Sequence, residues 1–349
     1  MDNLLARDLD HILEHTEPLW TAARGERFFL TGGTGFVGTW LIESLVWANA
    51  RLGLRISAVL LTRDPAAFQA RAPHLADDAA IELVPGDVAS FASPEGTFSF
   101  AVHAATQPFF APDVRRPGGT LDRDLPATRR VLEFARAAGV RRFLYTSSGA
   151  VYGKQPPELS HVPETYAGAP FTQDTQSGYG LNKRVSEYLC SCYAQVFGLE
   201  ATIARMFAFM GPHLPLGVNF AAGNFLRDAM AGGPIQVNGD GTPYRSYLYA
   251  ADLAIWLWTI LFRGRAAYPY NVGSPQEISI ADLAGTIARE VLPEVEIRIA
   301  QKAVAGAAAA RYVPSTERAE NELGLRVWVS LEEAIRRTRD WHRGREVGK

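Results

Sequence analysis

The sequence predicts an α/β fold in which a doubly wound parallel sheet is joined to a smaller C-terminal α/β lobe. Short apolar runs that suit buried strands alternate with segments of helical periodicity through about residue 205. A glycine-rich turn directly follows the first of these runs. Beyond Met206 the alternation weakens and Gly/Pro pairs punctuate the chain. Strands that alternate with helices predict a parallel sheet with right-handed crossovers, whose ligands lie beyond the carboxyl ends of the strands.

The individual elements can be assigned from these patterns. Residues 1–24 carry leucine and isoleucine at helical spacing and predict a helix ahead of the main fold. Strands are expected near residues 27–31, 56–62, 81–87, 98–105 and 141–148. A helix is expected over residues 129–138, where Gly139 would cap its end. The alanine-rich residues 303–310 predict a loop or a short helix.

Composition excludes several classes of protein. The 349 residues are 47% hydrophobic and 21% charged, and 35 basic and 37 acidic residues are mixed along the chain, so binding to nucleic acid or an anionic membrane is not expected. Cys190 and Cys192 stand two apart in a predicted helix, point to different faces and are interpreted as reduced packing residues, so no metal site is expected. The N-terminus lacks a secretory signal, which favours a cytoplasmic location. The most apolar run, residues 253–262, has about half the length of a bilayer crossing and predicts a buried helix.

The glycine-rich turn predicts a dinucleotide site. Gly32, Gly35 and Gly38 follow the first strand in the order GxxGxxG, and a helix begins near Phe36. Small residues let the backbone approach a pyrophosphate, and the free N–H groups of a helix N-terminus, here including Val37, attract its negative charge.

The end of the second predicted strand indicates which dinucleotide binds. NAD-specific proteins usually carry an acidic residue there for the ribose hydroxyls, and Thr62 occupies that place in this sequence. The guanidinium of Arg63 would instead pair with the 2′-phosphate of NADP. NADP is therefore preferred over NAD. In the alternative interpretation Arg63 is an exposed loop residue and Asp64 contacts the ribose.

Three residues form a candidate catalytic group. Tyr179 and Lys183 stand at i and i+4 of a predicted helix, so both side chains lie on one face. An ammonium group favours the phenolate, which allows Tyr179 to take or return the proton of a substrate hydroxyl while hydride moves to or from the cofactor. Ser148 ends a strand at the same edge of the sheet, where its hydroxyl would hold the substrate oxygen.

Together, TGGTGFVG, YTSSGAVYG, YGLNK, ARMFAFMGP and GDGTPYRSYLYAADLA resemble motifs of the extended short-chain dehydrogenase/reductases, the NAD-dependent epimerase/dehydratase family. The resemblance covers roughly residues 27–340. It implies a Rossmann-type fold, a nucleotide-sugar substrate, catalysis by Ser148, Tyr179 and Lys183, and an adenine contact at Asp87. It also implies that Arg245 binds the nucleotide diphosphate. The remaining residues that we expect at the two ligands are Val88, Ala104 and Ala105 for the cofactor, and Asn224, ahead of the helix FLRDAM, for the nucleotide.

The resemblance also implies a division of the chain and an assembly. We expect a helical extension at residues 1–25, a cofactor domain at 26–205 with returns from about 245–275, and a discontinuous substrate lobe at 206–345. Homodimers are frequent in the family, through a four-helix interface that would include the helix of Tyr179. Val185, Leu189 and Tyr193 suit that interface, and they suit an ordinary core as well.

Departures from the family pattern narrow the reaction. The family's 4,6-dehydratases carry an Asp-Glu pair directly after the catalytic residue, and its decarboxylases keep a glutamate two residues after it. This chain has Gly149 and Ala150 there. The usual asparagine of NVxGT is replaced by Asp124. We therefore expect an oxidoreductive sugar epimerase, with an NADPH-dependent ketoreductase as the main alternative. A 4,6-dehydratase or a decarboxylase is a less favoured alternative, and a non-catalytic dinucleotide sensor is a remote one.

Four other polar residues have weaker claims to a role. His103 ends a strand near the expected cofactor and is interpreted as a packing residue. His213 is interpreted as a solvent-facing loop histidine. Asp252 and Glu164 have no partner that the sequence identifies.

Overall fold

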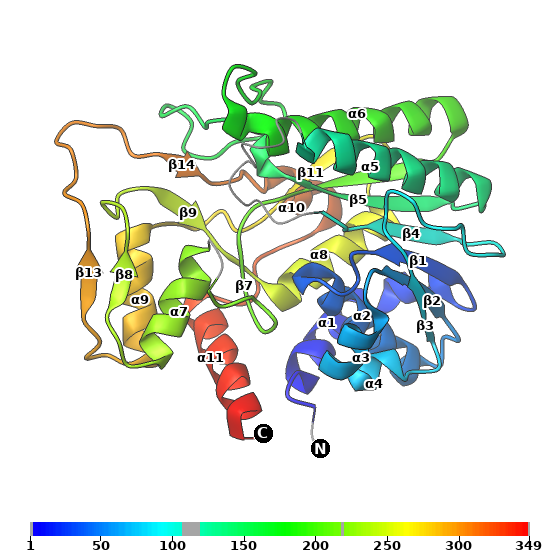
Figure 1. The fold of residues 1–349 in the computed structure, drawn as a ribbon, viewed down its shortest axis with the longest axis horizontal. Helices are drawn as coiled ribbons and strands as arrows, with labels where there is room; N and C mark the ends of the chain where they lie inside the picture. Colours follow the sequence, from blue (N-terminus) through cyan, green and yellow to red (C-terminus); the bar gives the residue numbers. More distant parts are fainter. Residues whose placement is uncertain (1–2, 107–118, 218–219, 348–349) are drawn as a thin grey trace.

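A computed structural model describes residues 3–106, 119–217 and 220–347 (Figure 1). Its central sheet has seven parallel strands in the order β11-β6-β5-β4-β1-β2-β3. The strands are β1 (Arg27–Thr31), β2 (Ser57–Thr62), β3 (Ile81–Pro85), β4 (Phe100–His103), β5 (Arg142–Ser148), β6 (Glu200–Met206) and β11 (Pro269–Val272). The strand order reverses between β1 and β4, which creates a crevice at their carboxyl ends. The predicted doubly wound fold is confirmed.

Helices cover both faces of the sheet (Figure 1). One face is covered by α5 (Gly119–Ala137) and α6 (Gly178–Phe197). The other is covered by α1 (Ala6–Trp20), α2 (Phe36–Leu52) and α8 (Ala250–Arg263). Short helices α3 (Pro65–Arg71) and α4 (Pro73–Ala76) join β2 to β3, and single 3-10 turns occur at Thr21–Ala23, Gly149–Tyr152 and Thr175–Ser177.

The most apolar segment of the chain lies inside the molecule. Every residue of α8 from Ala250 to Phe262 is buried, because this helix is packed between the sheet and α1. Within the described residues, no helix combines the length and hydropathy that a membrane crossing requires.

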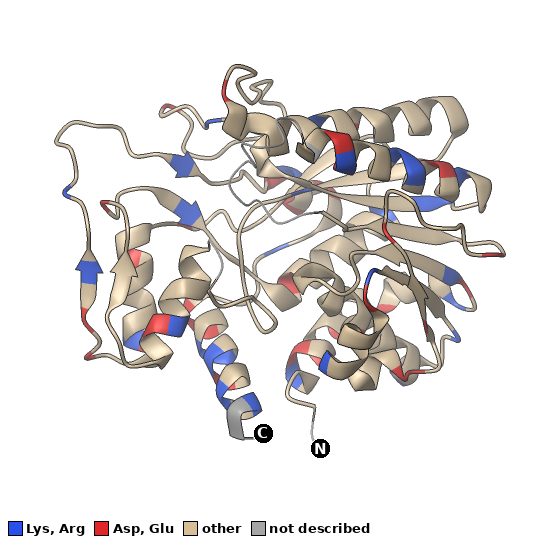
Figure 2. Cartoon of the chain, in the orientation of Figure 1, with Lys and Arg blue, Asp and Glu red and all other residues tan. Residues whose placement is uncertain are grey.

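A smaller lobe is built mainly from the C-terminal part of the chain and lies beside the carboxyl ends of the strands (Figure 1). Its elements are α7 (Ala221–Met230), β8 (Ile235–Val237), β9 (Tyr244–Ser246), β12 (Glu277–Ser279), α9 (Ile280–Val291), β13 (Ile297–Ile299), β14 (Arg311–Tyr312) and α11 (Leu331–Val347). In contrast, α10 (Glu317–Leu323) packs against β11 and α8 of the larger part. β7 (Phe209–Met210) and β10 (Leu248–Tyr249) pair between the two parts. Strand β14 pairs with β9 so that Tyr312 lies opposite Arg245. Basic and acidic residues are interspersed over both parts (Figure 2).

The N-terminal helix is part of the core. α1 packs against α2 and α8, and Trp20 at its end is fully buried, with its ring centroid 4.9 Å from that of Trp258 and 5.6 Å from that of Phe262. Asp8 accepts hydrogen bonds from Tyr249 Oη at 2.6 Å and from Arg337 Nη1 at 2.6 Å. These contacts fasten the first helix to the last one.

Trp20→Ala is therefore expected to lower the free energy of unfolding by about 3–5 kcal/mol, the usual cost of removing a large aromatic side chain from a core. Urea-induced unfolding measures this change. Val304→Ala removes an apolar side chain that is 72% exposed and is expected to leave the midpoint unchanged. Equal midpoints for both variants would mean that α1 does not contribute to the cooperative core.

Three predictions of local structure need correction. Asn224 lies within α7 rather than ahead of a helix. The helix expected over residues 129–138 begins ten residues earlier, at Gly119, because the polar sequence of its first turns hides its periodicity. His213 is mostly buried with φ of +68°, and its ring centroid lies 4.7 Å from that of Trp341, so it does not face solvent. Residues 303–310 form a loop.

Candidate functional site

The glycine loop lies at the crevice between β1 and β4. Gly32 has φ of +73°, and a Cβ on it would meet the carbonyl carbon of Ala104 and the nitrogen of Ala105 at 2.5 Å. A Cβ on Gly38 would meet the carbonyl oxygen of Gly32 at 2.2 Å. Only glycine fits such contacts without moving the backbone. The chain therefore forms a tight backbone cradle at the start of α2, which begins at Phe36, and Ala104 and Ala105 lie against that cradle.

Two exposed arginines, Arg63 and Arg71, follow β2. Thr62 is buried at the end of β2, whereas Arg63 follows on the exposed surface. Asp64 caps α3, because its Oδ1 accepts a hydrogen bond from the backbone N–H of Ala67 at 2.9 Å. Arg71 donates a hydrogen bond to the carbonyl oxygen of Thr34 in the glycine loop. Sequence reasoning missed Arg71, since nothing in its own segment marks it.

Asp87 and Val88 follow β3 at the same edge of the sheet. Asp87 Oδ1 accepts a hydrogen bond from the N–H of Ala89 at 2.9 Å, which orders the turn after the strand. Both residues are partly buried. They follow the carboxyl end of β3, the edge strand that pairs with β2.

The structure brings the three predicted catalytic residues together. Ser148 ends β5, and Tyr179 and Lys183 lie one turn apart on α6, which packs against β5. Lys183 is buried, and its Nζ donates a hydrogen bond to the carbonyl oxygen of Thr146 at 2.8 Å. The same Nζ lies 4.9 Å from the ring centroid of Tyr145 and 5.8 Å from that of Tyr179. A serine hydroxyl, a phenol and an amine thus lie close together at the end of β5.

Burial changes the titration of this group. Loss of hydration lowers the pKa of Lys183 to about 8, and the carboxylate of Asp124 opposes that decrease. Burial raises the pKa of Tyr179 above the ordinary phenol value, and a hydrogen bond with Ser148 acts in the opposite direction. The phenol is therefore neutral at rest and needs nearby positive charge to act as a base.

A second tyrosine completes the site. Tyr312 from β14 is partly buried, and its Oη lies 3.4 Å from Ser148 Oγ and 3.4 Å from the carbonyl oxygen of Met206. A Cβ on Gly149 would lie 2.7 Å from the ring of Phe207 and 2.8 Å from the hydroxyl of Tyr312. A side chain at the position after Ser148 would therefore require Phe207 or Tyr312 to move. Tyr312 stands 164 residues from Ser148, so no local signal could have identified it.

Arg245 connects the smaller lobe to this group, and Asn224 does not. The guanidinium of Arg245 lies 5.9 Å from the ring centroid of Tyr312, while its Nη1 donates to the carbonyl oxygen of Tyr244 at 2.7 Å. The remaining N–H groups of the planar guanidinium suit an anion. Asn224 Oδ1 instead accepts a hydrogen bond from Arg227 Nη1 at 3.4 Å, one turn along α7.

The surroundings of two histidines, His103 and His213, indicate structural roles. His103 Nδ1 lies 2.7 Å from Thr31 Oγ1 and its Nε2 lies 3.2 Å from Thr128 Oγ1, and burial lowers its pKa to about 3. A neutral, doubly hydrogen-bonded ring packs between β4 and α5. Burial also lowers the pKa of His213 to about 3, and four nearby cationic groups act in the same direction.

The two carboxylates without a predicted partner both have one. Glu164 Oε1 accepts a hydrogen bond from the N–H of Asn271 at 2.8 Å. Asp252 is fully buried and accepts from the N–H groups of Trp328 and Val329 at 2.9 and 3.0 Å. Both residues therefore hold segments of the chain together at a distance from the catalytic group.

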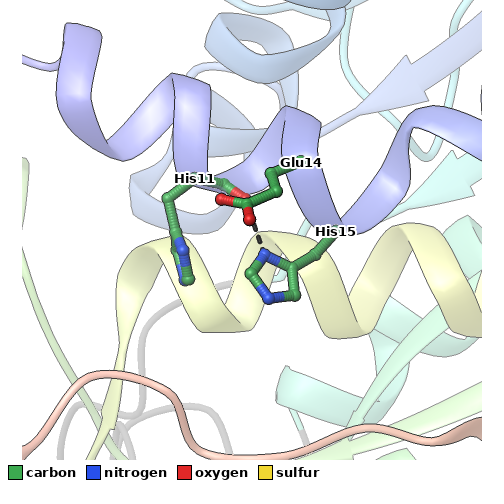
Figure 3. A group of neighbouring side chains, drawn as sticks. All are labelled: His11, Glu14 and His15. Carbon is green, nitrogen blue, oxygen red and sulfur yellow. Dashed lines mark hydrogen bonds between the residues drawn. The ribbon is translucent and has the colours of Figure 1, made fainter.

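A group of possible metal ligands lies on α1. His11, Glu14 and His15 place ligand-type atoms within 4.8 Å of one another (Figure 3). However, His11 Nε2 lies 3.1 Å from Asp252 Oδ1, His15 Nδ1 lies 2.9 Å from the carbonyl oxygen of His11, and the ring of His15 lies 4.5 Å from that of Trp328. We interpret these side chains as part of the contact between α1 and α8.

The cradle at the reversal of strand order, with Ser148, Tyr179 and Lys183 beside it, defines a dinucleotide-binding oxidoreductase of the short-chain type. Residues 28–273 match the model of the NAD dependent epimerase/dehydratase family, and the chain belongs to this family.

Its relatives catalyse different reactions. UDP-glucuronic acid decarboxylase 3 of Arabidopsis thaliana is 27% identical over 309 residues, which cover 88% of this chain and 86% of that enzyme. Two solved structures share the fold. Epimerase Mth375 of Methanothermobacter thermautotrophicus has a TM-score of 0.79 at 23% identity, with 96% of this chain and 97% of that chain covered. DesIV, a dTDP-glucose 4,6-dehydratase of Streptomyces venezuelae with NAD and TYD bound, has a TM-score of 0.77 at 23% identity, with 92% and 98% covered.

Proposed function

We propose that this protein is an NAD(P)-dependent nucleotide-sugar epimerase. Tyr179 takes the proton of a sugar hydroxyl that Ser148 holds, and Lys183 stabilises the phenolate that does so. A nicotinamide dinucleotide held at the glycine loop before α2 would supply the group that exchanges hydride with the sugar carbon. Tyr179 gives the proton back to the carbonyl oxygen when hydride returns to the opposite face of the sugar. Net oxidation is zero.

The observation that favours epimerisation over the elimination of water is the packing around Gly149, and the absence of a glutamate at Ala150 disfavours decarboxylation. Elimination of water needs an acid beside the catalytic serine, and the ring of Phe207 and the hydroxyl of Tyr312 fill that space. The experiment is to incubate the protein with UDP-glucuronic acid and with UDP- and dTDP-hexoses and to identify the products by NMR. We expect a change of configuration at one carbon, without loss of carbon dioxide or water.

A nucleotide-sugar substrate is supported by the relatives' names and by the position of Arg245. Arg245→Met removes a charged donor to the diphosphate, and such hydrogen bonds contribute about 1.5–3 kcal/mol. We expect KM for the nucleotide sugar to rise about tenfold to hundredfold, with a smaller change in kcat. Arg298→Met, on the exposed strand β13 of the same lobe, is the matched control. Equal KM values for the two variants would exclude Arg245 from the substrate site.

We infer that the cofactor is NADP, on the basis of the residues that follow β2. Asp64 is the alternative residue that could contact the ribose, but its carboxylate caps α3. Arg63, the preceding residue, is exposed, and Arg71 contacts the glycine loop. Denaturing the purified protein and identifying the released nucleotide tests this inference. NAD in place of NADP would overturn it. Stoichiometric consumption of added NADPH would favour the ketoreductase, the alternative that the same two arginines support.

A homodimer through α6 also remains a proposal, but its residues must be revised. Leu189 and Tyr193 are buried in the core of their own chain, so they are not available to a partner. Tyr188, Val196 and Phe197 are exposed instead, beside Val185. Their apolar surface suits a partner helix. Sedimentation as a monomer at micromolar concentration would contradict the dimer. The division into a cofactor domain and a substrate lobe and the cytoplasmic location stay predictions.

A further inference from the structure

Asp124 is a buried carboxylate that the proposed reaction does not use. It lies on α5 where this helix packs against α6, and it is 8% exposed. Its Oδ2 accepts a long hydrogen bond of 3.4 Å from Asn182 Nδ2, and its Oδ1 lies 3.4 Å from Nε of Arg123. Asn182, the neighbour of Lys183, has a buried Oδ1 without a hydrogen-bond partner within the described part of the chain. The carboxylate is thus held beside the catalytic lysine by few contacts.

The other ionisable groups around Lys183 are already compensated. On α6, the Glu187 carboxylate is bound by Arg205, with Nη2–Oε2 of 2.7 Å and Nε–Oε1 of 3.0 Å. Burial raises the pKa of the Cys190 thiol, so this group is neutral. His103 on β4 is neutral, and Tyr145 on β5 offers an uncharged ring. Asp124 on α5 is therefore the negative group near Lys183 that has no strong ion pair of its own.

The surroundings of Asp124 act on it in both directions. Burial raises its pKa, while the charges of Arg123 and Lys183 oppose that increase and Asp87 adds to it. Arg123 is about a third exposed, so water screens its attraction. The carboxylate in turn raises the pKa of Lys183 and of Tyr179. For Tyr179 the other facing groups are Tyr312 and Ser148.

We propose that Asp124 is a positioning residue of the active site, whose negative charge keeps Lys183 protonated and sets the pH range in which Tyr179 acts as a base. This proposal rests on the role proposed for Tyr179. Asparagine, the residue that the resembling family usually carries here, offers the same hydrogen-bond acceptor without the charge. With aspartate at this position, Lys183 stays protonated up to a higher pH and Tyr179 ionises at a higher pH. The pH range of activity is therefore expected to lie higher than it would with asparagine.

The test is the Asp124→Asn variant, which keeps the shape of the side chain and an acceptor for Asn182. We expect both the acid and the alkaline limb of its kcat/KM profile against pH to move to lower pH by about one unit, because one neighbouring negative charge is removed. Asp122→Asn, on the exposed side of the same helix, is expected to keep the original profile. A profile of Asp124→Asn that superimposes on that of the unmodified protein would overturn the proposal.

A second measurement does not depend on turnover. The ultraviolet absorbance of phenolate is titrated in the cofactor-loaded protein and in Tyr179→Phe, with and without Asp124→Asn, so that the difference isolates Tyr179. We expect its midpoint to fall in Asp124→Asn, and also in Asp124→Ser, a second uncharged variant. An unchanged or higher midpoint in the variants that fold overturns the proposal. A lower midpoint in a protein that converts no nucleotide sugar leaves the proposed coupling intact and rejects the proposed function.

Discussion

Replacing Tyr179 by phenylalanine is expected to lower kcat about 10³-fold and to leave the dissociation constant of the cofactor unchanged. Phenylalanine keeps the ring but cannot take or return the substrate proton, and general acid–base catalysis typically contributes about 10²–10⁴-fold. Steady-state kinetics on the nucleotide sugar identified as substrate, together with fluorescence titration of the cofactor, measures both quantities.

Tyr188→Phe is the matched control, because Tyr188 lies on the exposed side of the same helix and is 68% exposed. We expect it to retain full activity. Retention of a tenth or more of the activity by Tyr179→Phe would remove Tyr179 from the role of base.

Gly38→Ala is expected to be unusually harmful for a substitution that normally favours a helix. A Cβ at residue 38 would lie 2.2 Å from the carbonyl oxygen of Gly32 and 2.5 Å from the Cα of Gly33, so the glycine loop must move away from α2. Overpacking of this kind costs about 1–3 kcal/mol. We expect a similar loss in the free energy of unfolding and a decrease of about 30-fold to 100-fold in cofactor affinity.

The same substitution at another helical glycine serves as the control. At Gly285, inside α9, the nearest atom to an added Cβ is Nη1 of Arg289 at 3.5 Å, an ordinary contact. Gly285→Ala should therefore raise the free energy of unfolding by about 0.5–1 kcal/mol, as alanine does in an open helix position. If both variants were stabilised alike and bound cofactor normally, the cradle would not be the dinucleotide site.

The features that the sequence revealed were those encoded within short segments. The strand Arg27–Thr31 contains the apolar run Phe28 to Leu30 and is followed at once by the glycines, so both its limits and its place before the loop could be predicted locally. Tyr179 and Lys183 could be paired because helical spacing places them on one face. Their approach to Ser148 followed from the parallel sheet, in which the carboxyl ends of strands share one edge.

Contacts between distant segments could not be read in this way. Tyr312 reaches Ser148 because β14 pairs with β9, and Arg71 reaches Thr34 because α3 folds back over the glycine loop. Leu189 was equally suited to a core and to a dimer interface, and the packing of α6 on the sheet decided for the core. Each of these outcomes depends on tertiary packing rather than on local pattern.

The same limit applies to the reaction. The absence of acids at Gly149 and Ala150 was visible in the sequence, but a neighbouring segment could have supplied one. In the described structure the adjoining side chains are those of Phe207 and Tyr312, which are uncharged. A phenol beside the catalytic serine suits a hydrogen bond to substrate better than expulsion of water at neutral pH.

Recycling of the cofactor during epimerisation can be measured by counting the epimerised product formed per bound nicotinamide. The purified protein is incubated with UDP- and dTDP-hexoses, without added cofactor. We predict many product molecules for each nicotinamide and no net accumulation of the reduced form. Product that stops at one molecule per nicotinamide, or that forms in step with added NADPH, would contradict recycling of the cofactor.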